Sequence, residues 1–187
     1  MKNDLGASSG GKGIEPGAFL REQQRVIAAQ LVGGASLAQS LARLVETVEA
    51  HSDTGMLASV LLLDPDGRHL RHGAAPSLPE AYNAAIDGIE IGPSVGSCGT
   101  AAYCGHPIYV ADIAQDPLWR DFKELALGNG LRACWSMPVQ SSDNRVLGTF
   151  AIYYRAPRSP TDSDKELIRR AAETAALLIE TARRTGP

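Results

Sequence analysis

Apolar residues in the first third of the chain repeat with helical spacing. Over residues 18–32 they fall on roughly one face of a helix, and a Gly-Gly pair ends the pattern. A stronger apolar stripe runs through residues 36–51 and predicts a second amphipathic helix. Residues 1–16 are rich in Gly and Ser and show no such stripe. We therefore expect a disordered tail over residues 1–16 and one folded domain over residues 17–184.

Strands are predicted where short β-rich runs or strict alternation replace the helical spacing. Residues 56–63 and 69–75 flank an Asp-Pro-Asp-Gly turn, which predicts a hairpin. Residues 131–139 show the period of two that is typical of a strand. A Ser-Ser-Asp-Asn turn joins them to a strand predicted at residues 145–154, which gives a second hairpin. One further short strand is expected at residues 108–110.

Helices are expected in most of the remaining chain. The shorter ones are predicted at residues 79–86, 99–104 and 118–127, and Thr161 caps a long final helix with Asp164 three residues later. Hairpins flanked by helices at both ends predict an α+β fold, in which an antiparallel sheet carries the terminal helices on one face. The central helices then cover the other face.

The stretch 92–112 predicts a binding site at the start of a short helix. Ser97 is a good N-cap for this helix. Because the first amides of a helix lack partners within it, those of Cys98, Gly99 and Thr100 are expected to be free for an anion or a carbonyl group.

The composition excludes several classes of function. The chain has 187 residues, of which 44 % are hydrophobic and 21 % charged, and its formal net charge is −3. This balance gives no electrostatic reason to expect nucleic acid or an acidic membrane as a partner. No apolar run approaches the roughly 20 residues of a membrane span, and no signal-peptide pattern begins the chain. We therefore expect a cytoplasmic protein whose three cysteines are free thiols.

Four segments together resemble one known family. Gly96–Ala102, Val110–Trp119, Gly130–Pro138 and Val146–Arg155 are similar to GAF domains of bacterial two-component sensor kinases and cyclic-di-GMP regulators. The resemblance covers about residues 18–184. It implies a six-stranded antiparallel sheet with a ligand cleft on one face and terminal helices on the other, and those helices commonly mediate dimerisation. It also implies a sensory role in signal transduction rather than one reaction.

Two GAF subclasses and a metal site are disfavoured at the residue level. The dispersed Asn-Lys-Phe-Asp-Glu set of cyclic-nucleotide GAF domains cannot be traced. The Cys-His pair of bilin-binding GAF domains is missing, because Trp135 follows Cys134. Some GAF sensors hold haem through one His, but His69 and His72 point to opposite faces of a hairpin and make no metal pair. No cofactor is assigned.

The alternative function is that of a thiol redox enzyme. Free methionine-(R)-sulfoxide reductases are GAF proteins, and their Val-Cys-Gly resembles Ser97-Cys98-Gly99, where the helix dipole would favour a thiolate. In that enzyme family the nucleophilic cysteine lies in the segment before a strand that carries a Val-Pro pair. Residues 115–130 hold no cysteine, and Cys134 lies within the strand itself. We therefore expect no enzymatic activity and structural cysteines.

The candidate ligand-binding residues combine the start of the short helix with the strand beside it. Trp119 and Trp135 are expected to line a small pocket that also presents a few polar groups. The strand face opposite Trp135 carries Arg132, Cys134 and Ser136, and the sequence leaves open which face lines the cleft. The full predicted set is Ser97, Cys98, Gly99, Thr100, Asp112, Trp119, Arg132, Cys134, Trp135 and Ser136.

The predicted function is the sensing of a small anion or polar metabolite. Arg132 would be its charge partner if that strand face looks inward, whereas Asp112 either binds the ligand or caps a turn. Ligand binding would bias the packing of the terminal helices in a homodimer, with output through a separate output or kinase protein. The residues expected to form the dimer are Leu20, Ile27, Leu167, Ala171 and Leu178. A ligand-free dimerisation module is the third hypothesis.

Overall fold

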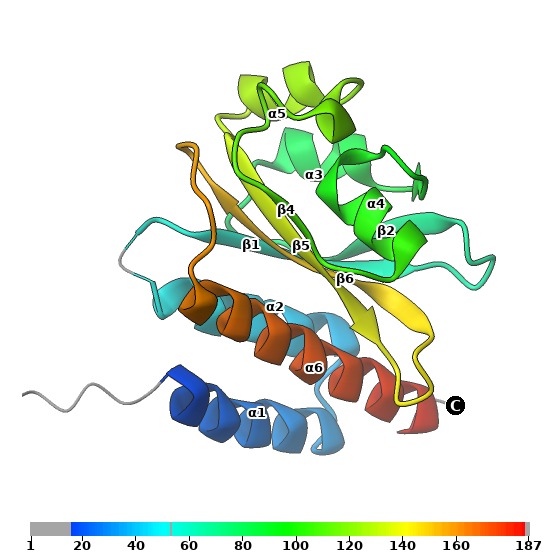
Figure 1. Ribbon diagram of the computed structural model, residues 1–187. Coiled ribbons are helices and arrows are strands. Elements are labelled where there is room, and N and C mark those ends of the chain that lie inside the picture. Colours follow the sequence, from blue (N-terminus) through cyan, green and yellow to red (C-terminus); the bar gives the residue numbers. More distant parts are fainter. Residues whose placement is uncertain (1–15, 53, 186–187) are drawn as a thin grey trace, which may run out of the picture.

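A six-stranded antiparallel sheet separates two groups of helices in the computed structural model, which describes residues 16–52 and 54–185 (Figure 1). The strand order is β3-β2-β1-β6-β5-β4, so the two predicted hairpins join side by side through β1 and β6. The strands are β1 (Leu57–Leu63), β2 (His69–Ala74), β3 (Ile89–Glu90), β4 (Ile108–Val110), β5 (Ala133–Gln140) and β6 (Val146–Tyr154). The predicted fold is confirmed. The sequence pattern missed only β3, which is too short to show a period.

The terminal helices lie together on one face of the sheet. α2 (Leu37–Ala50) and α6 (Asp162–Thr185) pack on the strands, and α1 (Pro16–Val32) packs against both of these helices (Figure 1). At the start of α6 the Asp164 amide donates to Thr161 Oγ1, and the Thr161 amide donates to the Asp164 carboxylate. The cap predicted from the sequence is therefore confirmed.

Four of the five residues predicted to form a dimer belong to the core of the chain. Ile27, Leu167, Ala171 and Leu178 are all buried in one cluster with the sheet. The reason is that α1 covers α2 and α6, so the buried side chains of these helices face one another and the strands. The side chain of Leu20 and residues 1–15 of the predicted tail lie outside the described residues.

Shorter helices cover the opposite face of the sheet. They are α3 (Glu80–Ile86), α4 (Gly96–Cys104), the 3₁₀ helix η1 (Pro117–Trp119) and α5 (Lys123–Gly128). The single helix predicted for residues 118–127 is wrong. The Asp116 side chain caps the Leu118 amide, and the next amides bond three residues back instead of four, as in Phe122 N–H to the Trp119 carbonyl. The tighter turn ends before α5 begins.

The sheet divides the interior into two cores. Trp135, Phe150 and Ile152 face the terminal helices, whereas Cys134 and Tyr153 face the short helices. Successive side chains of a strand point to opposite faces, so neighbours in sequence belong to different cores. β5 and β6 are therefore in contact with both groups of helices at once.

Candidate functional site

A pocket lies between the short helices and the sheet. Its residues come from β1, β6, α3, β3, α4, η1 and α5 and from the segments beside them, and its volume is ≈ 30 Å³. That is roughly two to three times the ~10–15 Å³ needed to hold one water molecule. The lining residues are Leu61, Tyr82, Ile86, Ile89, Val95, Gly96, Ser97, Cys98, Trp119, Phe122, Leu125 and Tyr153. None of these is an Asp, Glu, Lys, Arg or His residue, so the pocket suits a very small uncharged molecule.

A chain of hydrogen bonds fixes the wall between η1, α4 and β5. Trp119 Nε1 donates to Ser97 Oγ over 3.1 Å, and Ser97 Oγ donates to the Cys134 carbonyl over 2.9 Å. All three residues are buried. The indole and the hydroxyl are thus held in place, which gives the pocket a pre-formed wall on this side.

The start of α4 differs from the sequence prediction. The N-cap is Val95 instead of Ser97, because the Ser97 hydroxyl is used across the fold and caps nothing. The Gly99 amide donates to the Val95 carbonyl over 3.1 Å, and Thr100 Oγ1 accepts from the Val95 amide. The Gly99 amide is therefore not free for a ligand, and Thr100 supports the loop before the helix.

Gly96 allows the pocket wall to close tightly. Its φ of +54° lies in the left-handed region, and a Cβ at this position would lie 3.5 Å from the Trp119 ring. The turn into α4 therefore packs directly on the indole.

The two buried thiols lie in the core between α4 and β5. Cys98 lines the pocket, and its Sγ lies 3.6 Å from Tyr153 Oη. A hydrogen bond with Cys134 lowers the pKa of Cys98 to about 7, against the opposing effect of burial. Burial raises the pKa of Cys134 well above its usual value. Cys98 is therefore the more acidic thiol and the one that reaches the pocket.

A layer of hydroxyl groups lies under these thiols. Ser59 Oγ donates to Tyr153 Oη over 3.4 Å, and burial raises the pKa values of Tyr153 and Tyr82. Ser136 Oγ and Thr149 Oγ1 are buried without a well-formed hydrogen bond, although both help to lower the pKa of Cys98. The pocket is therefore mainly apolar, and its polar groups lie on the side that faces the sheet.

Trp135 is a correction to the predicted site. It lies on the sheet face opposite the pocket, donates from Nε1 to the Arg158 carbonyl over 3.1 Å, and packs against Tyr154. The alternation of β5 directs Cys134 and Ser136 towards the short helices and Trp135 towards the terminal ones. Cys134 and Ser136 thus lie beneath the pocket, and Trp135 belongs to the other core.

Arg132 and Asp112 also lie outside the pocket lining. Arg132 Nη2 lies 3.9 Å from the Asp112 carboxylate, and both side chains are partly exposed. Asp112 Oδ1 accepts the Ala114 amide over 3.0 Å, so this residue caps a turn. The predicted charge partner for an anion therefore lies next to Asp112 and does not line the pocket.

Sequence reasoning missed the two tyrosines of the pocket. Tyr82 lies on α3 and meets Tyr153 of β6 edge to face, with ring centroids 5.9 Å apart. Tyr82 is one of two buried residues on α3, and Tyr153 alternates with Ile152 and Tyr154. The period-two pattern could have indicated that Tyr153 shares a face with Ala151, but the contact with α3 depends on the tertiary fold.

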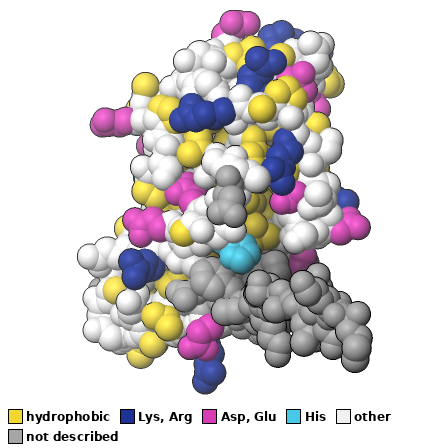
Figure 2. Space-filling model, turned by 90° about the vertical axis from the view of Figure 1, so that its left-hand side faces the viewer, with side chains coloured by type: hydrophobic (Ala, Val, Ile, Leu, Met, Phe, Trp, Pro, Cys, Tyr) yellow, Lys and Arg dark blue, Asp and Glu magenta, His cyan; other side chains and the backbone are white. Residues whose placement is uncertain are grey.

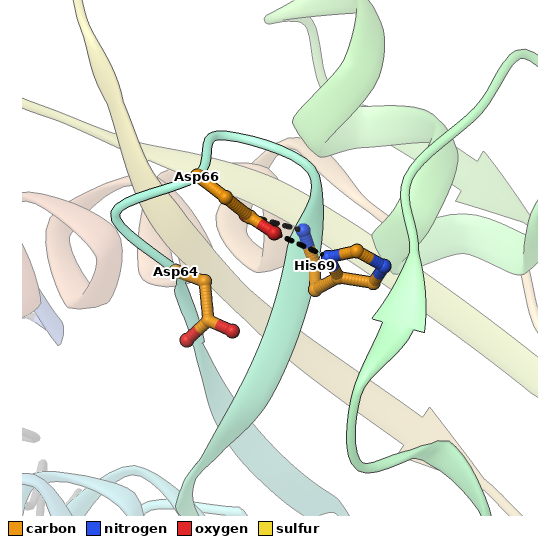
Figure 3. Close-up of side chains that lie close together, drawn as sticks. All are labelled: Asp64, Asp66 and His69. Carbon is orange, nitrogen blue, oxygen red and sulfur yellow. Dashed lines mark hydrogen bonds and ion pairs between the residues drawn. The ribbon is translucent and has the colours of Figure 1, made fainter.

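Two aspartates and a histidine gather at the β1–β2 hairpin, away from the pocket. Figure 3 shows the Asp66 carboxylate bonded to His69 through both its backbone and its ring. The Arg68 amide and then the His69 ring lower the pKa of Asp66. Asp64 is paired with Arg71 over 2.7 Å. These partners close the turn of the hairpin, and the cluster is explained by that role.

The surface carries charge of both signs. On the face seen in Figure 2, Lys and Arg side chains are interspersed with Asp and Glu side chains, and neither sign forms a continuous patch. This matches the small net charge and gives no extended basic surface on that face. None of the helices that the structure describes combines the length and apolarity that a membrane span requires.

The fold is that of a known family. The family model described as GAF domain matches residues 34–180. The chain is a GAF domain. A methyl sulfide methyltransferase-associated sensor from Methanosarcina acetivorans is 40 % identical over 162 residues, which are 87 % of this chain and 16 % of that protein. The GAF domain described here thus spans only a small part of the length of this relative.

Solved structures agree with this assignment. A domain assigned to a two-component sensor histidine kinase protein from Sinorhizobium meliloti 1021 superimposes with a TM-score of 0.65 at 25 % identity, covering 82 % of this chain and all of that one. A free methionine-R-sulfoxide reductase from Neisseria meningitidis, in complex with its substrate, gives a TM-score of 0.66 at 16 % identity, covering 96 % and 99 %. The second similarity shows the shared fold alone.

Proposed function

We propose that this GAF domain senses a small, uncharged and largely apolar molecule, which it binds in the pocket under α4. The single observation that carries the proposal is the lining. A pre-formed wall of Trp119 and Ser97 faces apolar side chains, and the polar groups of the lining are a thiol and hydroxyls. Such a site offers shape and one or two hydrogen bonds but no counter-charge.

This ligand class replaces the anion expected from the sequence. An ion buried without a paired charge loses several kcal/mol of hydration, and the described lining supplies no cation to compensate. The Gly99 amide, which was to bind the anion, is already bonded to Val95. A neutral ligand has neither problem.

The signal is proposed to pass through β6 to the terminal helices. Tyr153 faces the pocket, and its neighbour Tyr154 faces the core of α2 and α6. A ligand that displaces Tyr153 shifts this strand against α6, provided that the ligand prefers one of two packings. Output then passes to a kinase or another output protein. A sensory role is supported by the relative from Methanosarcina acetivorans, which is a sensor, and by the histidine kinase domain.

A panel of small molecules tests the proposal. The melting temperature should rise with short neutral compounds, including dimethyl sulfide, which is chosen from the name of the relative. It should not rise with nitrate, acetate or phosphate at the same ionic strength. A ligand at about one hundred times its Kd stabilises the folded chain by about 2.7 kcal/mol.

Two isoleucines on opposite edge strands give a matched pair of variants. Ile89 lines the pocket and Ile108 does not, although both are partly buried against the same core. Ile89→Phe fills the pocket and should abolish the response to the neutral compounds, whereas Ile108→Phe should keep it. A response only to anions, or an equal response in both variants, would contradict the proposed ligand class.

The reductase alternative is less well supported by the same lining. Free methionine sulfoxide carries both an amino and a carboxylate group, and a site of ≈ 30 Å³ without Asp, Glu, Lys or Arg offers these groups no ion-pair partners. We expect no turnover of methionine-(R)-sulfoxide with dithiothreitol as reductant. Turnover that depends on Cys98 would overturn this choice.

A further inference from the structure

We propose that Cys98 and Cys134 form a peroxide-reactive thiol pair, in which Cys98 is oxidised first and Cys134 then closes an intrachain disulfide with it. The proposal concerns a modification site and does not depend on the ligand proposed above. It uses the pocket only as the route by which a small oxidant reaches Cys98.

The placement of the two thiols follows from the contacts of their neighbours. Ser97, the residue before Cys98, bonds through Oγ to the backbone carbonyl of Cys134 over 2.9 Å. Cys134 pairs with Tyr153 across β5 and β6, and Cys98 Sγ lies 3.6 Å from Tyr153 Oη. α4 is therefore fixed on the strands at the level of Cys134, and the side chains of Cys98 and Cys134 are buried in the same core.

The two thiols differ in access. Cys98 lines the pocket and is 9 % exposed, whereas Cys134 is fully buried beneath it. A molecule as small as hydrogen peroxide fits a volume of ≈ 30 Å³. An oxidant in the pocket therefore reaches Cys98 first, and Cys134 is the buried thiol that reacts with the oxidised Cys98.

The surroundings favour the reactive form of Cys98. The thiolate is the nucleophile, and hydrogen bonds with Cys134 and Tyr153 lower the pKa of Cys98 to about 7. Ser136 Oγ and Thr149 Oγ1 are buried without a well-formed hydrogen bond. Both are available to donate to a negatively charged sulfur or to the oxygen added to it, which gives these two unpartnered hydroxyls a role.

The chemistry balances with a hydroperoxide as the oxidant. The Cys98 thiolate attacks one oxygen of hydrogen peroxide, the O–O bond breaks, and the leaving hydroxide takes up a proton to give water and a sulfenic acid. The Cys134 sulfur then attacks Cys98 Sγ, the S–O bond breaks, and the leaving hydroxide takes the Cys134 proton. Two thiols lose two electrons, and one peroxide becomes two molecules of water.

Peptide mapping of the unaltered chain tests this assignment. The reduced protein, with no ligand added, is treated with one equivalent of hydrogen peroxide, unfolded in the presence of an alkylating reagent and digested. The expected major product is a linked peptide that joins Cys98 to Cys134, with loss of two hydrogens from the intact mass. Oxidation at Cys104, a disulfide between two chains, or unchanged Cys98 and Cys134 would each overturn the proposal.

Two variants identify the order of events. Cys104→Ser removes the exposed thiol at the end of the same helix, and it should leave the linked product unchanged. Cys134→Ser should stop at the sulfenic acid, which dimedone traps on Cys98. Dimedone on neither residue would overturn the order, provided that circular dichroism shows a folded variant. Whatever these variants show, peptide mapping of the unaltered chain decides whether the Cys98–Cys134 disulfide forms. The thermal-shift panel tests the ligand site separately.

Discussion

A single hydroxyl group decides what the start of α4 does. From sequence, Ser97 is an N-cap that leaves the following amides free. In the fold, its Oγ accepts from Trp119 and donates to the carbonyl of Cys134. The residue therefore joins three elements and shapes a pocket wall, and Val95 takes the N-cap position in its place.

The Cys98 thiol gives a pH-dependent prediction at the same scale. With a pKa of about 7 the thiolate forms as the pH rises through neutrality, so alkylation by iodoacetamide should reach half its maximal rate near pH 7. The hydrogen bond with Cys134 is the main cause of this low pKa. Cys134→Ala should therefore move the midpoint upward, towards the value of about 8.5 for an ordinary thiol.

Rates measured in a Cys104→Ser background isolate Cys98, because Cys104 is the exposed thiol. A midpoint near pH 9 in the presence of Cys134 would show that burial outweighs the hydrogen bonds. The same midpoint with and without Cys134 would show that the two thiols do not interact.

At the scale of elements, close packing of α4 against its own N-terminal loop depends on a glycine. A Cβ on Gly99 would lie 2.6 Å from Val95 Cβ, which is too close for a β-branched neighbour to accept without a shift. We expect Gly99→Ala to lower the free energy of unfolding by about 1–3 kcal/mol, as measured by urea denaturation.

Gly128→Ala is the matched control, because a Cβ there meets nothing within 4 Å and the glycine also lies in a helix. Alanine has the higher helix propensity, so this change should be neutral or stabilising by up to about 1 kcal/mol. Equal losses in the two variants would show that the contact with Val95 is not what makes Gly99 necessary.

Periodicity predicted the elements well but could not orient them. The two hairpins and the cap at Thr161 follow from local patterns, and the structure confirms them. The face on which Trp135 lies depends on a contact between Ser97 and Cys134, which are 37 residues apart. No local pattern encodes that contact, so the sequence left the choice of face open, and the pocket assignment of Trp135 was wrong.

The break between η1 and α5 has a similar origin. Residues 118–127 have a composition that suits one helix, but the cap from Asp116 and the bonds of the 3₁₀ turn end it early. Trp119 ends the first turn, and its indole bonds to Ser97. The break in the predicted helix thus coincides with the hydrogen bond between Trp119 and Ser97, at the wall of the candidate pocket.

At the scale of the whole molecule, the sheet lies between the proposed ligand pocket and the terminal helices, and its strands contact both. The pocket lies over one core and the terminal helices pack on the other, and β5 and β6 contribute side chains to both. Of the residues predicted to form a dimer, Ile27, Leu167, Ala171 and Leu178 are buried within the chain. Communication with a partner is therefore proposed to depend on how α6 packs on the sheet instead of on an exposed apolar stripe.

The two tryptophans, which are the only ones in the chain, provide a test of this division. Trp119 lines the pocket and Trp135 lies in the other core. Trp135→Phe removes one hydrogen bond, to the Arg158 carbonyl, with a cost of about 1 kcal/mol from that bond. It leaves Trp119 as the sole indole, so the fluorescence of this variant reports on the pocket alone.

The most direct measurement is a fluorescence titration of Trp135→Phe with the neutral compounds that raise the melting temperature. A ligand in the pocket under α4 predicts a saturable change in the intensity or wavelength of Trp119 emission, which Ile89→Phe abolishes and Ile108→Phe retains. Binding detected by calorimetry without any change at Trp119, or an unaltered change in the Ile89→Phe background, would place the ligand elsewhere and contradict the proposed sensing site.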